Sequence, residues 1–138
     1  MTRIALLLSL LAALTVTPVA AEHEVYYRYT VVGYVTDAGR PRPRQDVELI
    51  RDKTGFSYVT GTDEAGLFVI VARLGDESAG ESLTLRVGAV DAPLTAHFDP
   101  SNHSDERGTR VDVEGRRFVE RPAWFWSTLA KLLGTSRR

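Results

Sequence analysis

The pattern of hydrophobic and polar positions divides most of the chain into short β-strands separated by turn residues. Residues 25–36 are dense in β-branched and aromatic side chains, and residues 82–88 alternate strictly between polar and apolar ones; both patterns are typical of strands. The remaining predicted strands cover residues 47–51, 56–60, 67–72 and 94–98, with a last one around Val111 and Val113. Seven short strands with turn signals about every ten residues predict an all-β fold, a seven-stranded antiparallel Greek-key β-sandwich.

The stretch from Leu67 to Ala72 is apolar at every position. Such a run is typical of a strand that is covered on both faces, so we predict that it lies in the centre of a sheet. Asp63 and Gly66 bracket the turn before it, and glycine suits the positive φ that a tight turn needs. Gly33, in the first predicted strand, indicates a bulge or the close approach of another backbone.

The first 21 residues have the layout of a secretory signal peptide. Arg3 supplies a positive charge, residues 4–14 are apolar except for Ser9, and residues 19–21 offer small side chains for cleavage. The apolar run is shorter than the roughly 20 residues of a membrane-spanning helix. We therefore expect cleavage near residue 21 and export to a bacterial periplasm, with full secretion as the alternative.

The rest of the chain has the length of one domain and contains no cysteine, so its stability must come from packing without disulfides. We assign residues 22–115 to the β-domain and residues 116–138 to a C-terminal tail. This tail holds five arginines and one lysine against a single glutamate. A basic tail beside an acidic body is expected to contact something anionic: lipid headgroups, an acidic partner or the body itself.

Three segments resemble a known family. They are residues 32–41 (VGYVTDAGRP), 47–49 (VEL) and 62–68 (TDEAGLF). Together they resemble the carboxypeptidase regulatory-like domain, a small transthyretin-like (prealbumin-like) β-sandwich. The resemblance implies a non-catalytic module of the kind appended to enzymes, transporters and surface proteins. It carries no functional residues, because the matching elements are a folding signature, and the tail after residue 115 has no counterpart in it.

The sequence lacks the patterns of common catalytic sites. It has no cysteine nucleophile, no Gly-x-Ser-x-Gly elbow and no phosphate-binding glycine loop. Transthyretin-like hydrolases, which this chain resembles in fold, use several histidines and end in Tyr-Arg-Gly-Ser, whereas this chain has three histidines and ends in Ser-Arg-Arg. We therefore expect neither enzymatic activity nor a cofactor.

Two histidines and two aspartates suggest a metal site. His97, Asp99, His103 and Asp105 form two His-x-Asp pairs, and imidazole with carboxylate can bind zinc or copper. The alternative is an ordinary solvated loop with turn-forming residues. A separate copper site could form at His23 if cleavage fell after residue 20.

Tyrosines in the first predicted strand suggest a carbohydrate site. Tyr27 and Tyr29 share one side of that strand, where their rings could stack on a sugar, although core and edge packing would place them equally well. A periplasmic module for a small ligand, either carbohydrate or copper and zinc, is therefore the alternative function.

The tail contains the clearest binding signal. Pro122 can open a helix, and the apolar residues that follow fall largely on one stripe. They are Trp124, Phe125, Trp126, Leu129, Leu132 and Leu133. The segment is too short to span a bilayer, so it lies in a membrane interface, docks on a partner or packs on the sandwich. We predict a protein-binding or envelope-assembly module whose tail docks on a partner or membrane surface, with no nucleic-acid partner and an undetermined oligomeric state.

Overall fold

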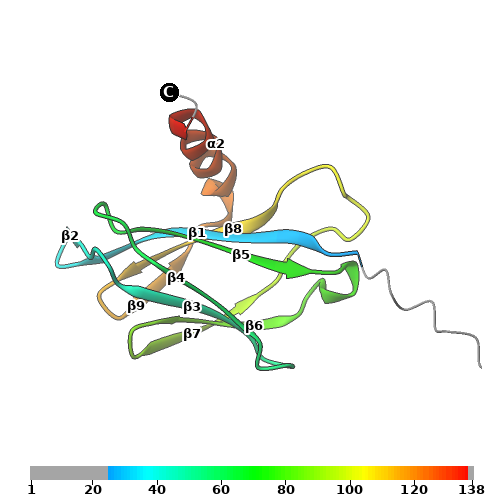
Figure 1. Ribbon diagram of the computed structural model, residues 1–138, viewed down its shortest axis with the longest axis horizontal. Coiled ribbons are helices and arrows are strands. Elements are labelled where there is room, and N and C mark those ends of the chain that lie inside the picture. The colour runs from blue at the N-terminus through cyan, green and yellow to red at the C-terminus, as the bar shows by residue number, and fades with distance from the viewer. Residues whose placement is uncertain (1–24, 137–138) are drawn as a thin grey trace, which may run out of the picture.

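The computed structural model describes residues 25–136 of the chain, so the predicted signal segment and His23 lie outside the described residues. The fold is mostly β, with two sheets that face each other and one short C-terminal α-helix (Figure 1). This confirms the all-β class. The described part contains nine strands where the sequence predicted seven.

The first sheet contains β1 (Tyr27–Asp37), β2 (Arg40–Pro41), β5 (Leu67–Leu74), β8 (Arg107–Glu114) and β9 (Arg117–Glu120). The second contains β3 (Asp46–Arg51), β4 (Ser57–Gly61), β6 (Ser82–Val87) and β7 (Val90–Thr95). Two 3₁₀ turns, η1 (Asp76–Ser78) and η2 (Pro122–Trp124), and the helix α2 (Phe125–Ser136) complete the described chain.

The prediction of an entirely antiparallel sandwich is wrong, because β1 and β8 pair in parallel. In the first sheet β1 lies between β5 and β8, and β9 pairs with β8 at the other edge. The short β2 pairs with the end of β1, beyond the residues that pair with β5. The second sheet runs β4-β3-β6-β7 and is antiparallel throughout.

The core lies between the two sheets and uses the alternation of each strand. Its members from the first sheet are Tyr29, Val31, Val35, Phe68, Ile70, Ala72, Leu74, Val111 and Val113. Those from the second sheet and the residue after it are Val47, Leu49, Leu83, Leu85, Val87, Leu94 and Ala96. The strands β4 and β9 add the partly buried Tyr58 and Phe118, which pack against these residues. One continuous core therefore stabilises the domain without cysteines.

Gly33 marks a close backbone approach. A Cβ built at this position would lie 1.7 Å from the carbonyl oxygen of Val111 on β8. The pairing of β1 with β8 keeps one register on both sides of Gly33, from Val32 opposite Arg110 to Val35 opposite Val113. The glycine therefore serves the parallel contact, and the ladder contains no bulge there.

The Leu67–Ala72 run is not a central strand, which corrects the prediction. It lies within β5, at an edge of the first sheet, where Val69 is 39% and Val71 is 42% exposed. The strand that is covered on both faces is β1, in which the neighbours Val31 and Val32 are both fully buried. An apolar run is compatible with burial on both faces of a strand. It does not determine whether other elements of the chain pack on both of those faces.

Asp63 and Gly66 shape the turn that enters β5. One carboxylate oxygen of Asp63 accepts hydrogen bonds from the backbone N–H groups of Ala65 and Leu67, each at 2.9 Å. Gly66 has φ of 78°, which is unfavourable for a side chain. Its carbonyl accepts the N–H of Val35 at 2.8 Å, so this turn is joined directly to β1.

The sequence did not predict three short elements: the strand β2, the 3₁₀ turn η1 between β5 and β6, and the strand β9. The strand β9 lies in the segment that was assigned to the tail, so the sheet extends to Glu120. Of its four residues, only Phe118 packs on the core, and two adjacent apolar residues between Arg117 and Glu120 give no alternation that would indicate a strand.

We expect Tyr29 to make the fold sensitive to alkali. Burial, together with the negative charge of Glu120, raises the pKa of Tyr29 from 10.0 to about 12. The folded state favours the protonated phenol, so this stabilisation is complete below pH 10.0 and is lost as the pH rises through about 12. Chemical denaturation between pH 9 and 12 should show that the free energy of unfolding falls by roughly 2–3 kcal/mol in the natural protein but not in Tyr29→Phe.

Tyr26→Phe, a change at an exposed position, is the control and should show the same fall as the natural protein. An equal fall in Tyr29→Phe would contradict the assignment to Tyr29.

Candidate functional site

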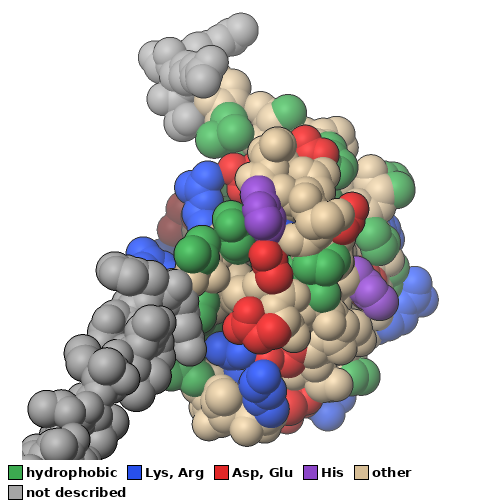
Figure 2. All heavy atoms as spheres, turned by 90° about the vertical axis from the view of Figure 1, so that its right-hand side faces the viewer, with side chains coloured by type: hydrophobic (Ala, Val, Ile, Leu, Met, Phe, Trp, Pro, Cys, Tyr) green, Lys and Arg blue, Asp and Glu red, His purple; other side chains and the backbone are tan. Residues whose placement is uncertain are grey.

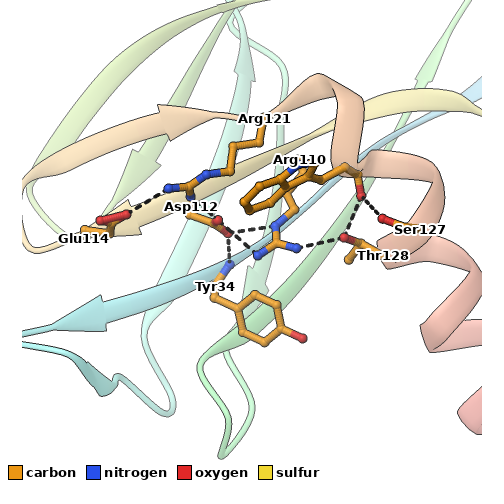
Figure 3. A network of polar contacts seen from close by, with 8 residues as sticks. Tyr34, Arg110, Asp112, Glu114, Arg121, Ser127 and Thr128 are labelled. Atoms are coloured by element: carbon orange, nitrogen blue, oxygen red, sulfur yellow. Dashed lines mark hydrogen bonds and ion pairs between the residues drawn. The ribbon is translucent and has the colours of Figure 1, made fainter.

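The carboxylate of Asp112 joins β1, β8 and the chain that leads into α2 (Figure 3). Its Oδ1 accepts the backbone N–H of Tyr34 at 3.1 Å. Arg110 donates from Nε and Nη2 to its two oxygens, both at 3.1 Å. Arg121 donates from Nη1 to Oδ2 and from Nη2 to Glu114 at 3.3 Å. We call Asp112, Arg110, Arg121 and the Tyr34 N–H the Asp112 network.

The network occupies an opening in the β1–β8 ladder. Pairing stops after Val32 and Arg110 and resumes at Val35 and Val113, and the Asp112 carboxylate accepts the Tyr34 N–H in between. The side chain of Asp112 is only 9% exposed. A buried carboxylate must be compensated by hydrogen-bonded cations, and the two arginines provide that compensation.

The same arginines hold the first turn of the C-terminal helix. Arg110 donates from Nη1 to Thr128 Oγ1 at 3.0 Å, and this hydroxyl donates to the carbonyl of Trp124 at 2.7 Å. The guanidinium carbons of Arg110 and Arg121 lie 5.2 and 5.0 Å from the centroid of the Trp124 ring, within cation–π range. The start of α2 is thereby joined to the sheet through one tryptophan and one threonine.

Phe125 supplies the apolar part of this joint. Its side chain is 2% exposed, and a Cβ built at Gly108 on β8 would lie 2.7 Å from its ring. The missing side chain at Gly108 therefore makes the space that Phe125 fills. A helix of 12 residues is marginal in water when isolated, so α2 depends on this contact and on the Asp112 network.

The tail residues that the sequence predicted for binding divide into two groups. Phe125 is buried, and Trp124, although half exposed, contacts both arginines. Trp126 is 52% and Leu133 56% exposed. Leu129 and Leu132 are half-buried. Beyond its first turn, α2 projects away from the first sheet (Figure 1).

A hollow of about 210 Å³ lies beside the start of α2. Its lining includes His97 and Phe98 from the loop after β7, together with Phe125 and Trp126 from the helix. The exposed Trp126 therefore lies at the edge of a concave surface that the loop and the helix form together.

Arg107 organises the loop between β7 and β8, a role that the sequence analysis missed. Its side chain is 6% exposed, and its guanidinium carbon lies 4.6 Å from the ring centroid of Tyr27 and 4.3 Å from that of Phe98. Its Nη2 donates to Asp76 at 3.0 Å and to the carbonyl of Asn102 at 3.1 Å. Arg107 thus fastens the loop to η1. An arginine at the start of a strand, after a polar loop, carries no sequence signal of burial.

Asp76 and His103 complete this loop anchor. His103 Nε2 lies 2.8 Å from Asp76 Oδ2, and its ring stacks on Tyr27 with centroids 4.6 Å apart. Burial opposes ionisation of Asp76, but the hydrogen bonds from Arg107 and His103 outweigh it and hold the pKa of Asp76 below its usual value. The carboxylate of Asp76 is therefore ionised at neutral pH.

The structure does not assemble the predicted metal ligands. His103 contacts Asp76, Asp99 accepts the N–H and hydroxyl of Ser101, and Asp105 accepts the side-chain amide of Asn102. The two described histidines are separate on the face seen in Figure 2. Within residues 25–136, no three His, Cys, Asp or Glu side chains are grouped so that they could hold a metal ion.

The two tyrosines suggested for a sugar site are already occupied by the protein. Tyr29 is 1% exposed and belongs to the core. Tyr27 has a ring contact with both His103 and Arg107. Neither ring offers the open face that stacking on a sugar requires.

Comparison of the chain with protein-family models, with curated proteins and with solved structures finds no match in any of the three. In the described part of the chain, no helix has the length and hydropathy to cross a membrane.

Removing the Asp112 carboxylate should loosen α2. In Asp112→Ala two partly buried guanidinium groups lose their common partner, so we expect the free energy of unfolding to fall by about 3 kcal/mol. Trp124 should become more mobile, which tryptophan fluorescence anisotropy and hydrogen exchange in α2 would measure.

Glu114→Ala is the matched control. Glu114 forms an ion pair with Arg121 and its side chain is 44% exposed, so its removal should cost less than about 1 kcal/mol. Equal losses in the two variants, or unchanged exchange in α2 of Asp112→Ala, would contradict the central role of Asp112.

Proposed function

We propose that this protein is a non-catalytic, exported module that docks through α2 on a partner protein of the cell envelope. The observation that carries the proposal is the division of the helix into an anchored first turn and an exposed apolar remainder. Phe125 and Thr128 are buried against the sheet, whereas Trp126 and Leu133 remain exposed. A helix held in one orientation has already met much of the ordering cost of binding.

The spacing of the exposed residues favours a groove on a protein. Trp126, Leu129, Ala130 and Leu133 follow the i, i+3, i+4, i+7 pattern of helices that bind in apolar grooves. Helices that lie in a membrane interface usually carry many lysines and arginines on their polar face. Between residues 125 and 136, Lys131 is the one charged residue, which makes membrane binding the weaker alternative.

The remaining parts of the proposal rest on the sequence. The layout of residues 1–21 supports export to the periplasm, or full secretion. The segments around Gly33 and Asp63 support membership in the carboxypeptidase regulatory-like family, with its transthyretin-like Greek-key arrangement. The small-ligand alternative has lost its nominated sugar and metal residues, so docking through α2 is the better-supported function.

Photo-crosslinking tests the docking helix. Truncation would remove the anchors Trp124 and Phe125, so a photoreactive amino acid is placed at position 126 or 133 of the full chain. The control position is Val59, an exposed apolar residue on β4. In the cell envelope, the two helix positions should give the same discrete protein adduct, and Val59 should not.

A second substitution distinguishes the alternatives. Leu133→Glu should reduce the adduct formed at position 126 at least fivefold, because it places a charge in the apolar stripe. Flotation with phosphatidylglycerol vesicles gives the membrane arm. Vesicle binding that Trp126→Ala abolishes, without a protein adduct, would move the function to the membrane; equal adducts at Val59 and on the helix would contradict docking.

A further inference from the structure

The hollow beside the start of α2, which we call the Trp126 hollow, is lined by a buried residue with an unpaired hydrogen-bond donor. Arg107 lines this hollow, and its side chain is only 6% exposed. Its Nη2 donates to Asp76 and to a loop carbonyl. Its Nη1 is buried and has no hydrogen-bond partner within residues 25–136. Such donors are rare, because burial has cost them their bonds to water. An oxygen acceptor supplied by a ligand would remove this deficit.

The same hollow offers an aromatic ring that the protein only partly covers. Trp126 lines it and is 52% exposed. The ring of the buried Phe125 lies against the Trp126 ring, with centroids 5.7 Å apart and an interplanar angle of 72°. This contact with a buried neighbour holds the Trp126 ring in place. A fixed, half-exposed ring at the edge of a hollow is a surface on which the apolar face of a sugar can stack.

The charges of the lining narrow the class of ligand. Three carboxylates, those of Asp99, Asp105 and Glu106, line the hollow against the single guanidinium group of Arg107. An anionic ligand would therefore meet more negative than positive charge. A simple cation would leave the Nη1 of Arg107 without an acceptor. A neutral ligand with several hydroxyl groups avoids both conflicts, because each hydroxyl donates one hydrogen bond and accepts others.

The three carboxylates retain capacity for such hydroxyl groups. Within residues 25–136, each bonds to the protein through one oxygen: Asp99 through Oδ1, Asp105 through Oδ2 and Glu106 through Oε1. A carboxylate accepts hydrogen bonds on both oxygens, so the second oxygen of each is a further acceptor. The hollow thus combines several acceptors with one unpaired donor, which is the complement of a polyhydroxylated ring.

We infer that the Trp126 hollow binds one ring of a neutral carbohydrate. The ring stacks on Trp126, a ligand oxygen accepts from the Nη1 of Arg107, and ligand hydroxyls donate to the carboxylates. The hollow has a volume of about 210 Å³, below the roughly 300–1,000 Å³ of pockets that enclose a drug-sized ligand. It therefore holds one ring of a longer chain, with weak affinity. Because Nη1 is buried, the loop between β7 and β8 must shift to admit the ligand oxygen.

A second hollow is also lined by Arg107, but it is less suited to a sugar. It has the same volume of about 210 Å³, and its tyrosine is Tyr27. The ring of Tyr27 already stacks on His103 and contacts the guanidinium group of Arg107. A sugar would have to displace these contacts, whereas Trp126 is half exposed.

The sugar site goes beyond docking through α2, and each can fail while the other holds. Both use Trp126, at the base of the helix. Leu133 belongs to the proposed docking stripe but does not line the hollow. A substitution at Leu133 therefore separates the two functions.

Saturation-transfer difference NMR, which detects weak ligands, measures sugar binding to the purified protein. The probes are chitotriose, cellotriose and maltotriose at millimolar concentration, and at least one of them should receive saturation. Trp126→Ala should weaken its binding at least about fivefold, because the stacking contact is lost. Leu133→Ala, a change on the same helix outside the hollow, should leave binding unchanged. No transfer to any of the probes, or equal effects of the two variants, would overturn the inference.

Trigalacturonic acid, which carries a carboxylate on each ring, tests the charge argument. At low ionic strength it should bind at least about tenfold more weakly than the neutral trimer, because the lining of the hollow is mainly negative. Equal or tighter binding of the acidic trimer would overturn the neutral class of ligand.

The role of Arg107 is tested without a substitution, because this residue also organises the loop. On addition of the bound trimer, the side-chain ¹⁵N–¹H resonances of Arg107 should shift together with the indole N–H of Trp126. A shift of the Trp126 resonance with none at Arg107 would contradict a bond from Nη1 to the sugar.

Discussion

The position of the C-terminal helix depends on one buried carboxylate. Asp112 takes the place of a missing rung between β1 and β8 and accepts hydrogen bonds from two arginines. Those arginines then contact Trp124 and Thr128 of the helix start. The requirement to compensate a buried charge is therefore met by groups that also orient α2. Without the parallel pairing of β1 with β8, the carboxylate would not reach the Tyr34 N–H, and the joint would not exist.

The sequence predicted the strands well because alternation is a local property. Seven segments were recognised, and the apolar stripe of the tail was placed on a helix. What local patterns cannot encode is the partner of each strand. Leu67–Ala72 has the composition of a central strand, yet it lies at an edge. The strand β8 alternates like a strand with one exposed face, yet Asp112 on that strand is buried and is held by Arg110 and Arg121. Phe125 is buried and Trp126 is exposed because the space beside Gly108 accommodates the ring of Phe125. Gly108 is distant in sequence from the tail, so a local pattern does not reveal this contact.

The loop between β7 and β8 shows why residue types alone mislead. Its two histidines and two aspartates resemble metal ligands in sequence, but in the structure His103, Asp99 and Asp105 each bind a neighbouring side chain or backbone group. His103 stacks on Tyr27 and contacts Asp76, and Asp99 caps the following turn. The organising residue is Arg107, which two aromatic rings and the loop carbonyls surround. A polar loop that must pass over the end of a sandwich needs such internal partners for its own backbone.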